Sequence, residues 1–468
     1  MPYINLRRWA GSLATSLDDE QLLPGDFAEM ENFIYDSNGF PIVRGGRRAW
    51  TASAISGTPT IRGLYYYRSS GISGHAGEWV ICYAGTALYE SRITGTFTSI
   101  TPTMTLPTQL RPSFTTFRGR MIVALGCSQY AKPHYWNIGY TEIKPIKAAP
   151  DATLVATHAS RLWVANRNEP SRIDYSAVLE PDNFNVADGA GWVYVGAGDG
   201  NDISAMVPGF AGEMIVFKDG PSGGATYRIQ GLSATEGFTI YPLSTTVGAV
   251  NHRCVAMIAD RDIYFASRRG IHSLRRVQEY GDLESASIDN EVSNKWRGLN
   301  DNARAQAVAV DDFGNDTWWL FYDSNGDGKN DRGLLFNYRH QTSRGNPRVS
   351  EVDFGANAAV AFRSASTNSE TLLTGGIADG KVYSEHNPEA NDDGTEFAWS
   401  ATLAGIDGGD STTTKAWQDL ALIYDNWGLG TFDVEWYGDN HAPSTSTLSL
   451  DPHGAPIPMR GVRSGNVR

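Results

Sequence analysis

Charged residues and cysteines are scarce in this sequence. Only 19% of the 468 residues are Asp, Glu, Lys or Arg, whereas soluble domains usually have about 25%. We therefore expect much of the surface to be neutral or covered by partners. The three cysteines are an odd number without metal-ligand spacing, which argues against a disulfide framework and a zinc site. We expect Cys82, Cys127 and Cys254 to lie inside strands, as small buried hydrophobic residues in a reducing environment.

Long apolar runs and targeting signals are also missing. No run approaches the roughly 18–20 apolar residues of a membrane helix. The start of the chain, Met1–Trp9, lacks the apolar centre of a secretory signal. The histidines show neither an H-E-x-x-H motif nor pairs four residues apart, so we expect no metalloenzyme. We expect a protein that stays in the cytoplasm or leaves it inside a larger particle.

The balance of charge is acidic. The formal net charge is −13 and the isoelectric point is near 5.2. A protein that grips nucleic acid through its phosphates usually carries the opposite charge. If DNA meets this chain, we expect repulsive guidance and no sequence-specific binding.

Seven copies of one short pattern run through the chain. Each copy has a turn residue, a charged residue and then large apolar residues. The charged positions lie 42, 41, 52, 49, 54 and 54 residues apart, and they are Glu78, Arg120, Arg161, Glu213, Asp262, Asp316 and Glu370. A period of about 40–55 residues with several short strands is typical of β-propeller blades.

The repeat predicts an all-β fold with three parts. These are an extended N-terminal arm (1–55), a six- to seven-bladed β-propeller (56–390), and a C-terminal β-sheet with a tail (391–468). The number of blades stays open, because the first and last repeats could close one blade between them. We expect the repeated pattern to form the inner edge of each blade.

Several local elements can be predicted within this plan. Residues 290–299 have the best helical signal, with Asp289 as a candidate N-cap. Strands are expected at 396–403, 416–424 and 431–437, the last two paired as a hairpin. The tail from 439 onward is rich in Pro, Ser and Gly and should be loose in the isolated chain. We expect partners to hold both ends of the chain.

The sharpest local motif is D-x-N-x-D-G-x-x-D at residues 323–331. Calcium takes six to eight oxygen ligands at about 2.3–2.6 Å, and alternate acidic side chains on a tight loop can supply them. The position of the bidentate EF-hand Glu is occupied by Leu334, so the motif resembles the short calcium hairpins of integrin-type propellers. The alternative is a solvated hairpin turn, which favours the same residues. The candidate ligands of a structural calcium ion are Asp323, Asn325, Asp327, the Lys329 carbonyl and Asp331.

Other segments carry weaker signals. Residues 312–318 are a near miss to a sialidase Asp-box, with Val310 at the Ser/Thr position and the Trp one residue late, and no second box occurs. The Gly-rich segments 196–200 and 222–224 lack the Lys-Ser/Thr of a phosphate loop and are interpreted as turns. We find no catalytic residue and no organic cofactor site, and we expect no enzymatic activity.

Several phrases resemble the β-propeller tail proteins of short-tailed bacteriophages, which include the packaged-DNA stabilisation proteins. The similar stretches lie between about 30 and 280. They are Leu23-Pro24 with Asn32, Gly39 to Gly46, His158 to Ala165, Ile173 to Ser176, Glu180 to Phe184, Val247 to Val250, Asp262 to Ser267 and Gly270 to Leu274.

This resemblance implies a virion protein without enzymatic activity. Its family forms a nozzle or hub ring below the portal, usually a homohexamer, that forms or gates the DNA exit channel. The expected partners are copies of itself, adaptor or portal-side proteins, and tail fibre or spike proteins. The protein would be assembled in the bacterial host cytoplasm and act in the virion tail during DNA ejection, without a membrane anchor.

Two other functions remain open. A propeller that binds or hydrolyses glycans should have convergent arginines and carboxylates at its central axis, or a row of exposed Trp. A propeller scaffold for cytosolic proteins should assemble without the N-terminal arm.

Overall fold

The chain divides into two units, Glu31–Trp399 and a second that combines Met1–Met30 with Ser400–Arg468. The predicted arm is therefore split, since residues 31–55 belong to the larger unit. The computed structural model describes residues 11–18, 21–23, 25–70, 76–93, 95–231, 237–259, 261–276, 287–389, 391–403, 419–422, 430–436, 444–450 and 457–460.

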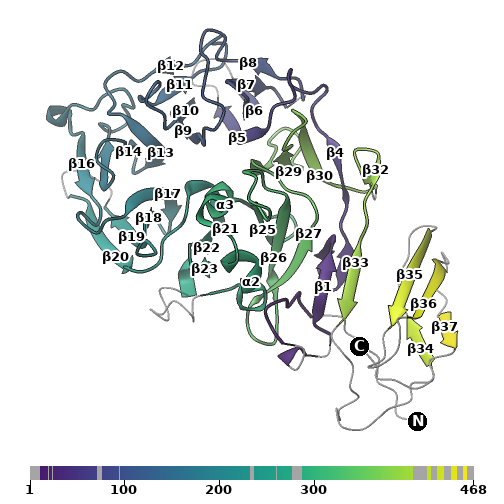
Figure 1. Cartoon of the computed structure of the whole chain (residues 1–468). Coiled ribbons are helices and arrows are strands. Elements are labelled where there is room, and N and C mark those ends of the chain that lie inside the picture. Colours follow the sequence, from purple (N-terminus) through teal and green to yellow (C-terminus); the bar gives the residue numbers. More distant parts are fainter. Residues whose placement is uncertain are drawn as a thin grey trace. The chain divides into compact units, whose positions relative to one another are not determined.

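The larger unit is a seven-bladed β-propeller (Figure 1). The innermost strand of each blade packs against those of its two neighbours, and β28 packs against β5, so the ring is closed. These innermost strands are β5 (Ile61–Ser70), β9 (Ser113–Phe117), β13 (Ala152–His158), β17 (Asp202–Phe210), β21 (Val255–Ile258), β24 (Val308–Asp312) and β28 (Ala359–Arg363). They define blades 1 to 7 in chain order.

The other strands follow outward in each blade, antiparallel to their neighbours. The second strands are β6 (Ala76–Ala84), β10 (Arg120–Ala124), β14 (Arg161–Asn166), β18 (Glu213–Asp219), β22 (Asp262–Ala266), β25 (Thr317–Tyr322) and β29 (Glu370–Gly375). The third strands are β7 (Ala87–Ser91), β11 (His134–Trp136), β15 (Arg172–Tyr175), β19 (Ala225–Gln230), β23 (Ile271–Ser273), β26 (Arg332–Gln341) and β30 (Val382–Asn387). The fourth strands are β8 (Thr98–Ser99), β12 (Lys144–Pro145), β16 (Gly191–Tyr194), β20 (Thr239–Ser244), β27 (Pro347–Val352) and, for blade 7, β4 (Gly46–Ala49).

The repeated sequence pattern falls on the second strands, so its assignment to the inner edge of the blades was wrong. A second strand has a strand on either side and a neighbouring blade on each face, so it is buried throughout, as in β14 and β25. The innermost strand lines the axis with one face and therefore alternates, as in β9 and β24. Unbroken apolar residues thus identify the second strand.

The turn before the pattern is a tight hairpin in three blades. Two consecutive residues with positive φ separate β9 from β10, β13 from β14, and β17 from β18. This is the geometry of a type I′ turn, whose twist matches that of the two strands it joins. In blade 3 the two positions are Ala159 (φ 47°) and Ser160 (φ 56°), neither of them glycine.

Blade 7 is completed by the N-terminal segment. Strand β4 pairs antiparallel with β30, with Tyr383 opposite Ala49. The short strand β31 (Asn391–Asp392) then pairs parallel with β4. The ring is therefore closed by residues more than three hundred positions apart in the sequence, and residues 46–49 of the predicted arm are part of a blade.

Arg44 fixes this closure. Its Nη1 and Nη2 donate to the two carboxylate oxygens of Asp392 at 2.9 and 2.7 Å, and its Nε donates to Asn32 Oδ1 at 2.9 Å. The guanidinium carbon lies 4.7 Å from the ring centre of Phe354 and 3.8 Å from that of Phe397. The Arg44 side chain is only 1% exposed, so charge and packing act together.

Blade 5 has three strands, followed by the helical segments η4 (Asn290–Val292), α2 (Ser293–Arg297) and α3 (Asp301–Gln306). The helix predicted at 290–299 thus exists, although its first turn is 3-10. Asp289 makes no capping hydrogen bond there, and its carboxylate accepts one from the Ser287 hydroxyl instead. No helix of the described residues is both long and apolar enough to cross a membrane.

The three cysteines differ in setting. Cys82 is buried in β6, as predicted. Cys254 is buried in the 3-10 helix η3 (His252–Cys254), and Cys127 is half-buried in the turn after β10. The prediction that all three lie in strands was therefore wrong for two of them.

In the described part of the second unit, the four strands that follow residue 418 form two pairs. β34 (Asp419–Leu422) pairs with β37 (Ile457–Arg460), and β35 (Gly430–Trp436) pairs with β36 (Ser444–Leu450), both antiparallel. The predicted hairpin between 416–424 and 431–437 was therefore wrong, because each strand pairs with a later one. The tail from 439 was expected to be loose, but β36 and β37 lie in it. The rest of that tail lies outside the described residues.

The remaining elements are short. They are β1 (Phe27–Glu31), β2 (Phe33–Tyr35), β3 (Pro41–Val43), η2 (Val186–Asp188), β32 (Thr395–Glu396) and β33 (Ser400–Leu403).

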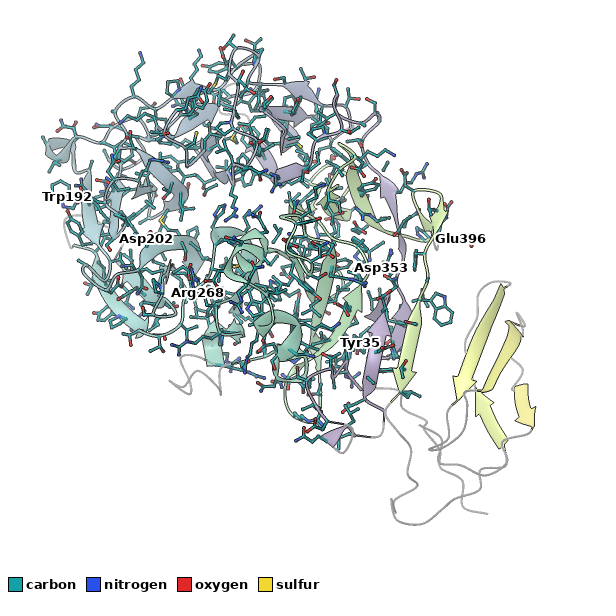
Figure 2. The ribbon with its side chains drawn as sticks, in the orientation of Figure 1. Tyr35, Trp192, Asp202, Arg268, Asp353 and Glu396 are labelled. Carbon is teal, nitrogen blue, oxygen red and sulfur yellow. The ribbon has the colours of Figure 1, made fainter. Side chains whose placement is uncertain are left out.

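Large apolar side chains gather in one exposed segment of blade 3. Figure 2 shows Trp192 at the outer rim of the propeller. Twelve large apolar side chains are exposed in the described residues, and five of them fall between 178 and 194. We call these five the blade-3 rim: Val178, Leu179, Val186, Trp192 and Tyr194, all 47–59% exposed.

Candidate functional site

The predicted calcium loop joins β25 to β26 in blade 6. Asp323 is 1% exposed, and its two carboxylate oxygens accept hydrogen bonds from the backbone N–H groups of Gly326 (2.6 Å) and Gly328 (2.8 Å). Asp331 accepts from the backbone N–H and the hydroxyl of Ser324, both at 2.7 Å. Gly328 has a φ of +85°, a left-handed conformation that glycine adopts readily, and the loop bends sharply there.

Two further predicted ligands bind the loop's own backbone. Asn325 Oδ1 accepts from Asp327 N, and Asp327 Oδ1 accepts from Lys329 N, each at 2.9 Å. These contacts are those of a hairpin turn rich in Asx residues. Within the described ranges, no group of three or more His, Cys, Asp or Glu residues is arranged to hold a metal ion. Calcium at this loop stays a prediction.

A residue that sequence reasoning missed anchors the loop. Asn330 is fully buried, and its Nδ2 donates to the carbonyl oxygens of Gln306 (3.1 Å) and Ala356 (2.8 Å). Its backbone N–H donates to Asn357 Oδ1 at 3.0 Å. These partners precede β24 and β28, so the loop lies at the end of the axis where innermost strands begin. We call this end the upstream face.

Three arginines meet at the upstream face, close to the propeller axis. Arg62 lies at the start of β5, Arg111 just before β9, and Arg253 in η3 just before β21. Arg253 Nη1 donates to Asn357 O and its Nη2 to Gln306 O, both at 3.1 Å. We call these residues the axial arginines. They come from blades 1, 2 and 5, which explains why no spacing in the sequence pointed to them.

The neighbouring segment of blade 5 is held tightly. Asn251 Oδ1 accepts from the backbone N–H groups of Arg253 (2.6 Å) and Cys254 (3.1 Å) and so caps η3. Its Nδ2 reaches the carbonyl oxygens of Ala305 and Ala307. His252 Nε2 lies 3.3 Å from Pro112 O, which links the segment before β21 to the segment before β9. The loops of blades 5 and 2 therefore meet across the axis.

Burial is the main cause of the pKa shifts of the axial arginines and His252. It lowers the pKa of Arg253 to about 9, and the positive charges of Arg111 and Arg62 lower it further in the same direction. Burial also lowers the pKa values of Arg62 and Arg111. The pKa of His252 is lowered to about 3, first by burial and then by Arg253, so the imidazole is neutral near pH 7.

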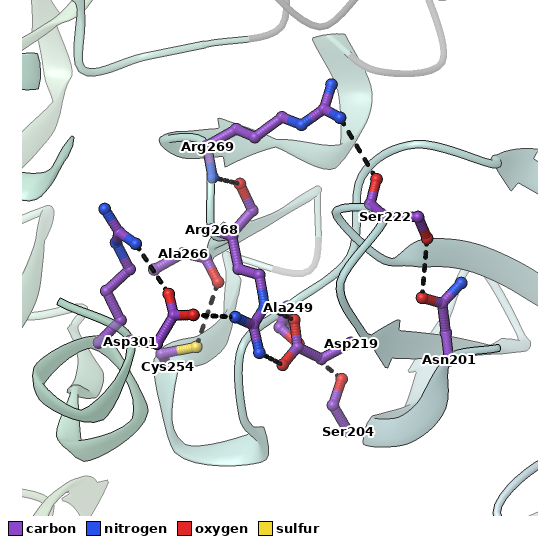
Figure 3. A network of polar contacts seen from close by, with 12 residues as sticks. Asn201, Ser204, Asp219, Ser222, Ala249, Cys254, Ala266, Arg268, Arg269 and Asp301 are labelled. Atoms are coloured by element: carbon purple, nitrogen blue, oxygen red, sulfur yellow. Dashed lines mark hydrogen bonds and ion pairs between the residues drawn. The ribbon is translucent and has the colours of Figure 1, made fainter.

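A second polar network lies on the same face, between blades 4 and 5 (Figure 3). Arg268 binds Asp219 through two hydrogen bonds, at 2.8 and 2.9 Å, and Asp301 through a third at 2.6 Å. Next to it, Arg269 donates to Ser222 O, and the Ser222 hydroxyl donates to Asn201 Oδ1. The charge of Arg268 is thus neutralised by the carboxylates of Asp219 and Asp301.

The Gly-rich segments are turns, as expected. Segment 196–200 wraps the ammonium group of Lys218, which is fully buried. Its Nζ donates to the carbonyl oxygens of Val195 and Gly196 and to Asp199 Oδ1, at 2.7–3.0 Å. Segment 222–224 is the turn between β18 and β19. The ammonium group of Lys218 therefore finds its hydrogen-bond acceptors in the turn.

The segment that is a near miss to an Asp-box forms the turn between β24 and β25. Asp312 Oδ2 lies 2.8 Å from His386 Nε2 in β30, and it accepts a hydrogen bond from Asn315 Nδ2 at 3.0 Å. Burial alone would lower the pKa of His386, but the bond to Asp312 raises it. These contacts tie blade 6 to blade 7.

The comparisons with known proteins give only a general likeness. No protein-family model matches the sequence, and no curated protein matches it. Among solved structures, a virginiamycin B lyase from Staphylococcus aureus is 11% identical with a TM-score of 0.41, over 73% of this chain and 99% of that one. YCF48 from Cyanidioschyzon merolae is 12% identical with a TM-score of 0.41, over 73% and 99%. BamB from Moraxella catarrhalis is 11% identical with a TM-score of 0.38, over 76% and 95%. Likeness at this level says nothing about activity or partners.

Proposed function

We propose that this protein is a structural subunit of the tail of a short-tailed bacteriophage. It forms a homo-oligomeric ring, a hexamer, that serves as the nozzle or hub below the portal and forms or gates the DNA exit channel. It acts without catalysis and without a membrane anchor. The observation that carries this proposal is the blade-3 rim, which is the kind of surface that another protein covers.

The rim supports assembly because of its size and position. A soluble monomer rarely exposes many large apolar side chains in one place. Trp192 and Tyr194 stand on β16, whose burial alternates so that every second side chain is exposed. As the outermost strand of blade 3, β16 also has one edge that no other strand of the described residues pairs with. A second copy of the chain is the partner that fits a closed ring.

The other features agree with a conduit built from many chains. We assign contacts with adaptor, portal-side, fibre or spike proteins to the second unit, which combines both ends of the chain. The net charge of −13 would let DNA slide through a channel without sequence-specific binding. The motifs that resemble tail propellers, at 158–165 and 262–274, belong to the propeller itself.

The proposal is tested by locating the protein and then breaking the rim. An epitope-tagged chain should appear in the tails of the phage that encodes it, as rings in electron micrographs. Trp192→Glu should abolish the rings and leave the propeller folded, as judged by circular dichroism. Trp399→Glu is the matched control, because Trp399 is also exposed (42%) but lies outside the rim. Tails without the tagged protein would end the proposal.

A glycan-binding or glycan-hydrolysing propeller is the second candidate. The axial arginines favour it, because such a protein needs convergent arginines at its axis. Hydrolysis would also require carboxylates, and none forms an ion pair with an axial arginine among the described residues or influences the pKa of one. Screening the protein against a panel of glycans separates this candidate from the first, since a tail conduit should cleave none of them and should not bind the neutral ones.

A further inference from the structure

The axial arginines lack the partners that buried arginines usually have. Guanidinium groups removed from water are normally matched by carboxylates or by several hydrogen-bond acceptors. In the part of the chain that the structure describes, Arg62 and Arg111 have neither an ion pair nor a hydrogen bond from their side chains. Arg62 is only 7% exposed, and Arg111 and Arg253 are half-buried. Three positive groups are therefore gathered in an acidic protein without an internal counter-charge.

Arg253 shows that the cluster is organised. Two of its nitrogens are held by the carbonyl oxygens of Gln306 and Asn357, which fixes the plane of the guanidinium. Its third nitrogen, Nε, is buried and has no hydrogen-bond partner among the described residues. The capped helix η3 fixes the backbone beneath it. Nη1 and Nη2 each carry a second N–H beyond these bonds, so the side chain is pre-organised and keeps donors for a ligand.

Comparison with Arg268 on the same face argues against a purely structural role. Arg268 bridges two carboxylates, and its removal would leave them unpaired. Arg111 bridges nothing, and it lies beside two other positive side chains that repel it. A charge that stabilises nothing within its own chain and opposes its neighbours is explained by a ligand of opposite charge.

We propose that Arg62, Arg111 and Arg253 form a binding site for an oxyanion, the carboxylate or phosphate group of a small ligand. A guanidinium donates two parallel hydrogen bonds to such a group, and several guanidinium groups can share its oxygens. The negative charge also removes the repulsion among the three arginines. This site is separate from the blade-3 rim and does not depend on the proposed assembly.

The test uses the full chain at low ionic strength. Thermal unfolding is followed with inorganic phosphate, with glucuronate as a sugar carboxylate, and with chloride at matched ionic strength. We expect phosphate or glucuronate to raise the Tm by about 3 °C more than chloride does. Response to phosphate alone assigns a phosphate ligand, and response to glucuronate assigns a carboxylate ligand. Titration calorimetry then gives the Kd.

Two arginine variants separate binding from structure. Arg111→Met should lose the response, weaken the Kd at least about tenfold, and melt at or above the wild-type temperature when no oxyanion is present. Arg268→Met is the matched control, which should melt at a lower temperature and keep the response. Arg111→Lys should keep part of it. The proposal is overturned if the wild type responds no more to either oxyanion than to chloride, or if Arg111→Met keeps the full response.

Discussion

Arg44 and the axial arginines, which are buried or half-buried in one propeller, differ in the partners of their guanidinium groups. Arg44, where the ring closes, has a bidentate carboxylate, an amide acceptor and two aromatic rings around its guanidinium. Among the axial arginines, Arg253 donates to two carbonyl oxygens, and none of the three pairs with a carboxylate in the described residues. The first arrangement stabilises the fold, whereas the second leaves charge available. Burial alone therefore does not reveal the role of a charged residue, and the identity of its partners does.

Arg44→Met should have the largest effect on stability. The change leaves the Asp392 carboxylate without its ion-pair partner and removes the contacts with the rings of Phe354 and Phe397. We therefore expect a loss of about 3–5 kcal/mol in the free energy of unfolding. Denaturant unfolding measures it. Arg48→Met, at the exposed position of β4, should change stability by less than about 0.5 kcal/mol. Equal effects of the two changes would show that Arg44 is not the residue that holds β4.

Glu78 is a buried carboxylate whose role can likewise be inferred from its partners. It is 9% exposed and accepts hydrogen bonds from Tyr66, Ala365 and two serine hydroxyls, which link blade 1 to blade 7. Burial alone would raise the pKa of Glu78, but these bonds lower it to about 2. Its stabilisation is therefore present above about pH 4.5 and is lost as the pH falls toward 2.

Glu78→Ala should cost about 2 kcal/mol at pH 7 and reduce the loss of stability in acid. Glu370→Ala removes the equivalent charged position of the repeat in blade 7, which is more exposed, and should cost less than about 1 kcal/mol. Urea unfolding at pH 7 and pH 3 measures both. A similar cost for both variants would mean that the hydrogen bonds of Glu78 do not matter.

Asp311 is a carboxylate whose hydrogen bonds do not outweigh the effect of burial on its pKa. Burial raises its pKa to about 7, and the charge of Asp312 acts in the same direction against the hydrogen bond from Tyr338. A raised pKa favours the protonated form in the folded state, so this stabilisation is complete below about pH 4 and is lost as the pH rises through 7. Asp311→Asn should therefore be more stable than the wild type by about 1–2 kcal/mol at pH 8 and equal to it at pH 4. Parallel curves for the two proteins between these pH values would refute this.

The smallest expected effect concerns the loop at 323–331. If calcium binds there, EDTA should lower the stability by about 1 kcal/mol, and Asp327→Ala should remove this sensitivity. Ser324→Ala keeps all five predicted ligands and should remain sensitive. Differential scanning calorimetry with and without EDTA decides the matter, and a wild type that does not respond leaves only a hairpin turn.

The sequence predicted what short-range patterns encode. Seven short apolar runs marked one strand in each blade, because both faces of such a strand are buried, as at Trp318 and Trp319, but they did not show that it is the second strand. Strand β4 was not predicted, because Gly46-Arg47-Arg48-Ala49 has neither alternation nor apolar residues. The pairing of β35 with β36 was missed because Ser444–Leu450, which is rich in Ser and Thr, was interpreted as part of a loose tail. The axial arginines belong to three different repeats, and only the closed ring brings them together.

The closure by β4 also sets an order of events during synthesis. Strand β4 leaves the ribosome early, but its partner β30 ends at Asn387, over 330 residues later. At roughly 5–20 residues per second, β4 waits on the order of 20–70 s without its pairing strand. During that time its edge is open to wrong partners. A circular permutant that begins after Ala49 and carries residues 1–49 behind residue 468 would shorten this delay and should fold faster with the same final blade.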